Sequence, residues 1–304
     1  MPLRPLRLGT RGSPLALWQA RHVAALLQPY ADPRPVELVR IETDGDRDQA
    51  TALSAMGGFG VFTKAIQNAL LANTVDLAVH SLKDLPTIAT EGLMLAATPS
   101  RGPTGDAFLS TKYKRFDDLP KGASVGTSSL RRRAMILNRR PDLNLVALRG
   151  NVDTRIRKLS EQNLDAIVLA EAGLKRLGLA DQIVEVLDEC WLLPAVGQGA
   201  IGLECRSDDH ETLAILNAIN DAVTWLRVTA ERAMLATLGG GCLVPIGVTT
   251  KIVDWVMTLR GAVLGADGGR KVVATYSGPA SSPLANGQET AAMLIDEGAR
   301  ELLL

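Results

Sequence analysis

The sequence predicts an α/β protein with two doubly wound lobes and a smaller α+β domain at the C-terminal end. Short apolar runs alternate with amphipathic runs between residues 123 and 170, and the same rhythm occurs between residues 6 and 80. Alternation at this pace is typical of βαβ units, which build a parallel sheet. From about residue 218 the pattern changes to a helix followed by strand-rich segments and a closing helix. This change predicts a third domain of a different class.

The first lobe is predicted from short apolar runs separated by helical patterns. In chain order the expected elements are a strand at 6–10 (LRLGT), a helix at 13–28, a strand at 36–43 (VELVRIET), a helix at 62–72 and a strand at 75–80 (VDLAVH). Residues 44–60 are polar, rich in glycine and aperiodic. Loops of this length inside a compact lobe are usually either functional lids or disordered. We favour a lid, with disorder as the alternative.

The second lobe and the C-terminal domain follow the same reasoning. In the second lobe we expect strands at 123–127 (ASVGT), 143–150 (LNLVALRG) and 164–170 (LDAIVLA), with helices at 129–140 and 152–160 between them. In the C-terminal domain we expect strands at 244–252 (VPIGVTTKI) and 271–278 (KVVATYSG) and a helix near 288–303. The predicted domains are therefore residues 1–98 with about 197–217, residues 99–196, and residues 218–304.

Composition excludes several classes of protein. The 304 residues are 46% hydrophobic, which is enough for two or three separate cores. Lysine plus arginine and aspartate plus glutamate both number 33, so no overall charge attracts the chain to nucleic acid or to an anionic membrane. We find no signal-peptide pattern and no apolar stretch approaching the roughly 20 residues of a membrane span. We therefore expect a cytoplasmic protein.

The cysteines and histidines argue against a metal site. Cys190, Cys205 and Cys242 are an odd number without CxxC spacing, which disfavours a disulfide framework and a structural zinc site. The three histidines are equally scattered along the sequence. We predict that no metal is bound.

Residues just after the predicted strands point to an anionic ligand, because ligands of open parallel sheets bind at the carboxyl ends of the strands. Hydroxyls at helix starts and the forked donors of arginine both suit anions. An isolated arginine is more often a solvated surface charge, and we expect Arg133 to be one, but so many at strand ends are not explained this way. Phosphate-loop motifs are missing, so a carboxylate is favoured. The residues concerned are Arg11, Ser13, Ser81, Lys83, Asp84, Thr127, Ser128, Ser129, Arg131, Arg132, Arg149 and Arg155.

Cys242 follows three glycines in the segment LATLGGGCLVPIG. One interpretation is a helix end capped by glycine, with the cysteine as a small buried apolar residue. The other is a thiol on a bare loop, where glycines clear space for a bulky group to approach the sulfur. Taken alone, the segment favours the first.

Motifs along nearly the whole chain resemble those of the hydroxymethylbilane synthase family, also called the porphobilinogen deaminase family. These motifs are TRGSPLALWQA, VDLAVHSLKDLP, VGTSSLRRR, LRGNVDTR, LAEAGLKRLG, LPAVGQGAIGLECR, RVTAERAML and GGGCLVPIG. The resemblance implies three domains, of which the first two are similar to periplasmic solute-binding folds. It also implies an enzyme that condenses four porphobilinogen molecules head to tail, releasing ammonia, into 1-hydroxymethylbilane. The resemblance also implies that the protein is a monomer, with porphobilinogen as its substrate.

The resemblance also implies the site residues. The cofactor would be dipyrromethane, held by a thioether on Cys242, and Asp84 would be the catalytic carboxylate that stabilises the cation left when ammonia departs. The acetate and propionate groups of the growing chain would be held by basic side chains, with neutral hydrogen bonds from hydroxyls and one amide. By motif match these residues are Arg11, Lys83, Arg131, Arg132, Arg149, Arg155 and Arg176, together with Ser13, Ser81, Thr127, Ser129 and Gln198.

The chain departs from the family pattern at a few positions. Phe59 stands where lysine is usual, Ala65 and Gln67 stand where acidic residues are common, and Gly239 replaces the usual glutamate before the cofactor cysteine. The segment SRGPTGDAF lacks the acidic residue that often follows the arginine. These departures bear on the lid and on packing near the cysteine loop rather than on Asp84 or Cys242.

Two other functions are compatible with parts of the sequence. A two-lobed carboxylate-binding or sensor module without turnover would also use arginines, but it would not need a cysteine on a glycine loop in a third domain. A cysteine hydrolase would need a histidine base within hydrogen-bond reach of the thiol, and no histidine stands in a recognisable pairing context.

Overall fold

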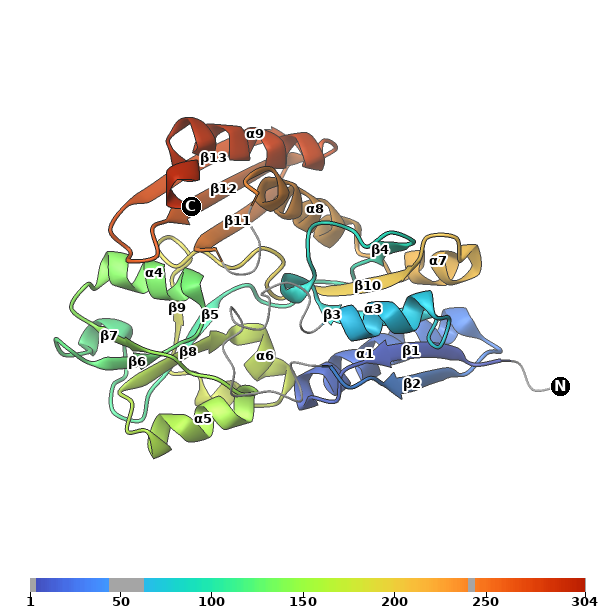
Figure 1. Cartoon of the computed structure of the whole chain (residues 1–304), viewed down its shortest axis with the longest axis horizontal. Helices are drawn as coiled ribbons and strands as arrows, with labels where there is room; N and C mark the ends of the chain where they lie inside the picture. The colour runs from blue at the N-terminus through green and yellow to red at the C-terminus, as the bar shows by residue number, and fades with distance from the viewer. Residues whose placement is uncertain (1–3, 44–62, 240–243, 304) are drawn as a thin grey trace. The chain divides into compact units, whose positions relative to one another are not determined.

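The computed structural model describes residues 4–43, 63–239 and 244–303. The chain forms two compact units, each built from two separate stretches of sequence. Unit 1 comprises Met1–Gly102 and Gly199–Trp225, and unit 2 comprises Pro103–Gln198 and Leu226–Leu304. Figure 1 shows the helices and strands of both units by label.

Unit 1 is built on a five-stranded sheet. Its strands in spatial order are β2 (Val36–Arg40), β1 (Leu6–Thr10), β3 (Leu77–Ser81), β10 (Ile201–Arg206) and β4 (Leu93–Ala97). The strands β2, β1 and β3 are parallel, whereas β10 runs antiparallel to both of its neighbours. The carboxyl ends of β1 and β3 therefore lie at the same edge of the sheet.

Alternate residues of these strands pack into two apolar cores, one on each face of the sheet, because successive side chains of a strand point to opposite faces. Leu77 and Val79 pack on the face that is covered by α1 (Pro14–Ala31) and α7 (His210–Asn217). Ala78 packs on the other face, against α3 (Lys64–Leu71). A short 3-10 helix, η1 (Leu82–Asp84), follows β3 directly. The starts of α1, α3 and η1 thus come close to the same edge of the sheet (Figure 1).

Unit 2 contains a second five-stranded sheet with the same arrangement. Its spatial order is β7 (Asn144–Val146), β6 (Ser124–Gly126), β8 (Ala166–Ala170), β5 (Asp106–Leu109) and β9 (Glu185–Leu187). The strands β7, β6 and β8 are parallel, and β5 runs antiparallel to β8 and β9. In both units, therefore, the fourth strand in spatial order is the reversed one.

Helices cover both faces of the second sheet, as expected for a doubly wound fold. On one face, α4 (Leu130–Arg139) contributes Ala134, Met135 and Ile136 to a core that includes the ring of Phe108. On the other face, α5 (Val152–Glu161) and α6 (Glu171–Arg176) pack over β8. Two 3-10 turns, η2 (Phe116–Asp118) and η3 (Ala180–Gln182), complete this part of the unit.

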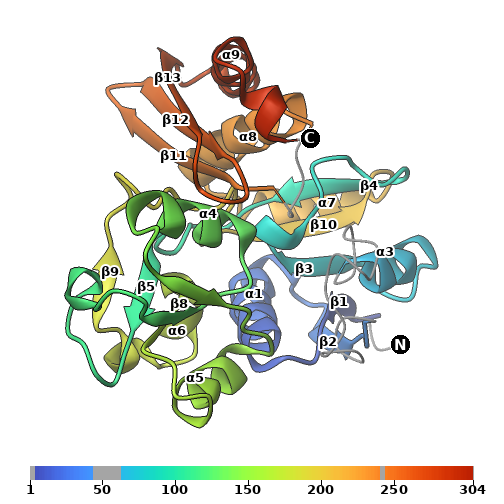
Figure 2. The ribbon, with the colours of Figure 1, turned by 60° about the vertical axis from the view of Figure 1, so that its left-hand side comes forward.

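A smaller antiparallel sheet forms the rest of unit 2. Its strands β11 (Ile246–Val253), β12 (Val256–Leu264) and β13 (Lys271–Pro279) pair in chain order. Figure 2 shows α8 (Ala222–Thr237) and α9 (Pro283–Asp296) beside this sheet, and the 3-10 turn η4 (Ala299–Leu302) ends the described chain. Met234, Leu259 and Leu294 are fully buried in the core between them. The boundary between the two units falls within α8.

The prediction of two doubly wound sheets and a smaller α+β part is confirmed by this architecture. Each sheet also contains one antiparallel strand, β10 in unit 1 and β5 in unit 2, which the expectation of a parallel sheet did not include. The closing helix, expected at 288–303, begins at Pro283 instead, because the proline occupies the first helical turn, where its missing N–H costs nothing. The loop at 44–60 lies outside the described residues, and the division into three domains stays a prediction. None of the helices in the described ranges is long and apolar enough to cross a membrane.

Candidate active site

The edge of the unit 1 sheet brings together four of the predicted site residues. Arg11 follows β1, and Ser13 is the N-cap of α1, with extended backbone angles of φ −67° and ψ 149°. The Ser13 hydroxyl accepts a hydrogen bond from the backbone N–H of Ala16 at 3.3 Å. Such a cap satisfies one of the free N–H groups at a helix start and stabilises the helix by about 1 kcal/mol. The cap therefore fixes the turn that carries Arg11.

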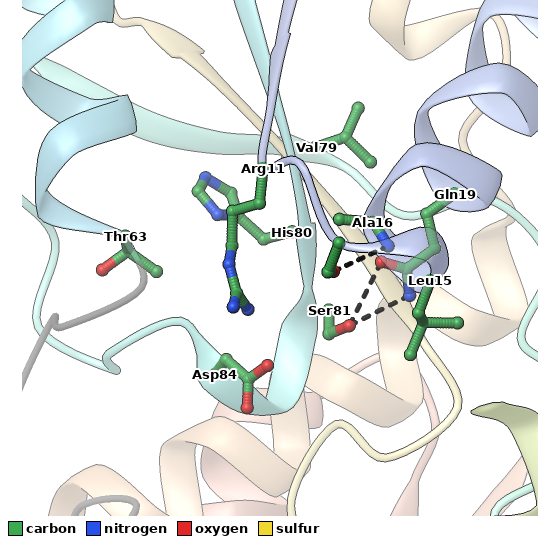
Figure 3. Close-up of a pocket in the computed structure, with 10 residues that line it drawn as sticks. Arg11, Leu15, Ala16, Gln19, Thr63, Val79, His80, Ser81 and Asp84 are labelled. Atoms are coloured by element: carbon green, nitrogen blue, oxygen red, sulfur yellow. Dashed lines mark hydrogen bonds between the residues drawn. The ribbon is translucent and has the colours of Figure 1, made fainter. Parts of the chain in front are cut away.

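Ser81 and Asp84 complete the set from the neighbouring strand. Ser81 is the last residue of β3, and Asp84 ends η1, where both side chains are half-buried. Together with Arg11 and Ser13 they line a hollow of about 80 Å³. Figure 3 shows the Arg11 and Asp84 side chains extending into this hollow. The hollow thus combines a guanidinium group and a carboxylate at the carboxyl ends of two parallel strands, where ligands of such sheets bind.

Three further polar residues line the hollow, and sequence reasoning did not select them. The amide of Gln19 lies beside the Ser81 hydroxyl, with Nε2 at 3.0 Å and Oε1 at 3.2 Å from its oxygen (Figure 3). His80 and Thr63 also line the hollow. Gln19 is only 2% exposed. A polar residue in the middle of an apolar helix face was the sequence signal that could have identified it.

Lys83 lies in η1, one residue before Asp84, and is half-buried. It does not belong to the set of described residues that line the hollow. The structure therefore brings together Arg11, Ser13, Ser81 and Asp84, with Lys83 adjacent to them in the chain.

In unit 2 the predicted hydroxyl residues organise the start of α4. Thr127 directly follows β6, and Ser129 is the N-cap of α4, accepting from the backbone N–H of Arg132 at 3.4 Å. The hydroxyl of Thr127 accepts a hydrogen bond from the N–H of Ser129 at 3.2 Å. Ser128 is tied to the next strand end, donating to the carbonyl of Leu148 at 2.8 Å. The helix start is thus built as expected, and it sets the direction of the arginines that follow.

Arg131 and Arg132 are buried and share one carboxylate, Asp106. Arg131 Nη1 lies 2.7 Å from Asp106 Oδ2, and Arg132 Nη2 lies 2.7 Å from Asp106 Oδ1. The two arginines are only 4% and 5% exposed. Burial by itself would raise the pKa of Asp106, but the charges and hydrogen bonds of the two arginines outweigh burial and hold this pKa well below its usual range. Two guanidinium groups thus share one buried carboxylate, and Arg131 also interacts with the charge of Glu189.

Gln198 belongs to the same cluster. Its amide nitrogen donates to Asp106 Oδ1 at 2.9 Å and to the carbonyl of Thr104 at 2.6 Å. The side chain is 1% exposed. Gln198 therefore braces the segment before β5 and helps to hold the carboxylate that the arginines share.

Arg149 and Arg155 flank the start of α5 and are half-buried. Arg155 Nε donates to the carbonyl of Gly150 at 2.8 Å. Gly150 has a left-handed φ of 112°, and a Cβ there would lie 2.6 Å from Cγ2 of Thr154, so this turn requires glycine.

Arg176 is the last residue of α6, and burial lowers its pKa to about 10. It therefore remains a cation near neutral pH, when carboxylates are ionised. The three arginines of this region supply positive charge that is only partly withdrawn from solvent.

The predicted cofactor cysteine, Cys242, lies outside the described residues. Of the two described cysteines, Cys190 is exposed and Cys205 is buried. Burial raises the pKa of the Cys205 thiol to about 12, which makes it a poor nucleophile. Across residues 4–43, 63–239 and 244–303, no three His, Cys, Asp or Glu side chains gather into a group that could hold a metal ion.

Comparison with known proteins matches two family models to the chain. The model described as "Porphobilinogen deaminase, dipyromethane cofactor binding domain" matches residues 6–214, and "Porphobilinogen deaminase, C-terminal domain" matches residues 225–296. The chain is 46% identical to the porphobilinogen deaminase of Syntrophotalea carbinolica, over 98% of this chain and 95% of the relative. It is 48% identical to the porphobilinogen deaminase of Acidithiobacillus ferrooxidans, over 98% of this chain and 97% of the relative.

Solved structures with a similar backbone include two binding proteins. The methionine-binding protein MetQ gives a TM-score of 0.45 at 14% identity, covering 74% of this chain and 94% of its own. The aliphatic sulphonate-binding protein SsuA of Escherichia coli gives a TM-score of 0.43 at 16% identity, covering 77% of this chain and 70% of its own.

Proposed function

Since the chain belongs to the porphobilinogen deaminase family, we propose that the hollow of unit 1 and the arginines of unit 2 carry the reaction of this family. The protein is a transferase of tetrapyrrole biosynthesis. It condenses four porphobilinogen molecules head to tail, with release of ammonia, into the linear tetrapyrrole 1-hydroxymethylbilane. A binding module without turnover is not favoured, because the relatives that match along the whole chain carry the name of the enzyme.

Asp84 is the proposed catalytic residue. The observation that carries this assignment is the shared hollow, in which the carboxylate of Asp84 and the guanidinium group of Arg11 line one small space. Porphobilinogen has a cationic aminomethyl group and two carboxylates, so it needs both charges. Departure of ammonia leaves a cationic azafulvene, which a fixed carboxylate stabilises while it accepts a hydrogen bond from the pyrrole N–H. The same carboxylate takes up and returns the proton that each condensation releases.

The basic side chains are proposed to hold the acetate and propionate groups. In unit 1, Arg11 and Lys83 take this role, with Ser13 and Ser81 adding neutral hydrogen bonds. In unit 2, Arg131 and Arg132 share the single carboxylate of Asp106, and guanidinium groups bind anionic oxygens well. The unit 2 residues are Thr127, Ser129, Arg131, Arg132, Arg149, Arg155, Arg176 and Gln198.

The residues present suit dipyrromethane, the cofactor named in the description of the model that matches residues 6–214. Arg131 Nε is buried and has no hydrogen-bond partner among the described residues, so a donor remains for a ligand oxygen. When bound, dipyrromethane supplies the pyrrole carbon that receives the first substrate ring. We propose that Cys242 holds it through a thioether, with Arg131, Arg132, Arg149 and Arg155 binding its carboxylates.

The intact mass of the denatured protein, with a tryptic map around Cys242, tests the attachment. An excess equal to two linked porphobilinogen-derived rings on the Cys242 peptide is expected, and Cys242→Ser should lack it. A bare mass that stays bare after incubation with porphobilinogen would contradict the proposed attachment.

The role of Asp84 is tested by Asp84→Asn, which keeps the size of the side chain and removes its charge. We expect the melting temperature to change little and turnover to fall by about 10²-fold or more, which is the usual range for loss of a proton-transferring group. Steady-state formation of bilane from porphobilinogen measures this. A normal rate would refute the assignment.

We also propose that the enzyme works in the cytoplasm as a monomer, without nucleic acid or membrane partners. Light scattering coupled to gel filtration tests the monomer, since a dimer would double the mass.

A further inference from the structure

Three buried polar side chains of unit 1 form a hydrogen-bonded cluster that includes one residue of the hollow. His80 lines the hollow, and its Nε2 lies 3.2 Å from Oε2 of Glu204. The amide nitrogen of Gln67 donates to the same carboxylate, at 2.9 Å from Oε1 and 3.2 Å from Oε2. Gln67 comes from α3, His80 from β3 and Glu204 from β10. Side chains from three separate elements are therefore linked by hydrogen bonds, and the proposed function gives none of the three residues a role.

The sheet register explains why these residues meet. His80 pairs with Gly202 across the antiparallel strands, and Glu204 is two residues further along β10. Residues two apart on a strand lie on the same face, so the His80 and Glu204 side chains are diagonal neighbours. This is the face that packs against α3, which contributes Gln67. The backbone pairing thus places the two side chains within reach of each other.

The His80–Glu204 contact is buried and is held by further hydrogen bonds. The side chains of His80 and Glu204 are 3% and 4% exposed. The contact joins Nε2 of His80 to a carboxylate oxygen, and a hydrogen bond there has the ring nitrogen as donor when the carboxylate is ionised, since an ionised carboxylate can only accept. The Gln67 amide nitrogen lies within hydrogen-bond distance of both carboxylate oxygens and so helps to hold Glu204 in place. Glu204 is therefore held by two partners, Gln67 and His80.

We infer that Glu204, held by Gln67, is a positioning residue for the reaction and acts through His80. It holds the orientation of the imidazole, which forms part of the wall of the hollow beside Arg11 (Figure 3). A fixed wall keeps the substrate ring aligned with Asp84, and small misalignments of reacting groups cost large factors in rate. This inference rests on the proposed function of the hollow.

A matched control exists in the same unit. Asp76 is also a buried acid, 3% exposed, and it pairs with Arg7 at 2.7 Å. It directly precedes β3, at the end of that strand opposite to His80 and away from the residues that line the hollow. Asp76→Asn therefore removes a buried charge from the same sheet without touching the hollow. A purely structural role of Glu204 would make the two substitutions behave alike.

The experiment compares Glu204→Gln, His80→Ala, the double variant and Asp76→Asn in the cofactor-loaded enzyme. Cofactor content is checked by mass, and melting temperature, kcat and KM for porphobilinogen are measured. We expect Glu204→Gln to lower kcat about tenfold with KM within about twofold, and to lower it no further in the His80→Ala background. Asp76→Asn should lower the melting temperature and leave kcat unchanged.

Each outcome decides the inference. A Glu204→Gln enzyme with normal kcat, or losses of Glu204→Gln and His80→Ala that multiply in the double variant, would overturn it. If Glu204→Gln does not fold, Gln67→Met replaces it, because this change releases the same carboxylate while filling similar space; an unchanged kcat would again overturn it. Asp84→Asn is measured alongside: a fully active Asp84→Asn refutes the proposed site itself, whereas an inactive one beside a normal Glu204→Gln refutes only this inference.

Discussion

Asp106→Asn is expected to destabilise unit 2 strongly, because Asp106 is the shared partner of two buried arginines. The substitution keeps the size of the side chain and removes its charge. It leaves the guanidinium groups of Arg131 and Arg132, 4% and 5% exposed, without the carboxylate that contacts both. Breaking a buried ion pair by removing one partner costs about 3–5 kcal/mol, since the remaining charge is desolvated and uncompensated. For a unit of this size the loss corresponds to a fall in melting temperature of roughly 6–20 °C.

The dependence on pH gives a second signature of the same carboxylate. Arg131 and Arg132 hold the pKa of Asp106 below its usual range against the opposing effect of burial. A carboxyl group with a depressed pKa in the folded state stabilises the fold above its unfolded pKa, about 4, and this contribution disappears as the pH falls towards the folded value. The difference in stability between wild type and Asp106→Asn should therefore be constant from about pH 5 to 8 and shrink below about pH 4.

Calorimetry on both proteins measures these effects, and Asp117→Asn provides the control. Asp117 contacts Arg139 at 3.0 Å, but the two side chains are 54% and 39% exposed, so its loss should cost less than about 1 kcal/mol. If Asp106→Asn melted within about 2 °C of wild type, the shared carboxylate would not stabilise the two buried arginines to this extent.

Three other substitutions or reactions have defined outcomes. Ser13→Ala should lower the free energy of unfolding by about 1 kcal/mol in denaturant titrations, because the N–H of Ala16 loses its acceptor; an unchanged midpoint would contradict the cap. Iodoacetamide at pH 8 should label exposed Cys190 and spare Cys205 in the native protein, because burial raises the pKa of Cys205 to about 12; peptide masses report this, and a labelled Cys205 would show the burial argument to be wrong. Arg176→Gln should raise KM for porphobilinogen about tenfold or more, the usual value of a charge-assisted hydrogen bond; an unaltered KM would remove Arg176 from the binding residues.

Much of the fold could be predicted because most strands and helices carry a local signal. The strand expected at 6–10 is β1 with the same bounds, and the helix expected at 152–160 is α5 with one residue more. The reversed strands β10 and β5 could not be predicted, because an apolar run does not encode the direction of its partner. In β10, Leu203 pairs with Val79, which is far away in the sequence. The direction of this pairing depends on tertiary packing, which the local sequence pattern does not show.

Part of the site could be predicted because ligands of parallel sheets bind at the carboxyl ends of the strands. Arg11, Ser13, Ser81 and Asp84 were expected from that rule, and they line one hollow. The sequence did not reveal that Arg131 and Arg132 share Asp106, since the partner lies 25 and 26 residues away at the start of a strand.

The pairing of His80 with Glu204 was missed for the same reason, with a separation of 124 residues. Contacts of this kind depend on the register between paired strands, and a local sequence pattern does not show which strands pair or in which register.

The reversed strand of unit 1 has a consequence for synthesis on the ribosome. The strands β5 to β9 of the second sheet lie within residues 106–187, so this sheet can close as soon as that stretch has emerged. The first sheet must wait for residues 201–206, because β10 separates β3 from β4, and β4 has no other neighbour in the sheet. The nascent chain therefore exposes an unfinished amino-terminal sheet while a later one is already complete. Chaperones that shield unpaired strand edges would be needed most during that interval.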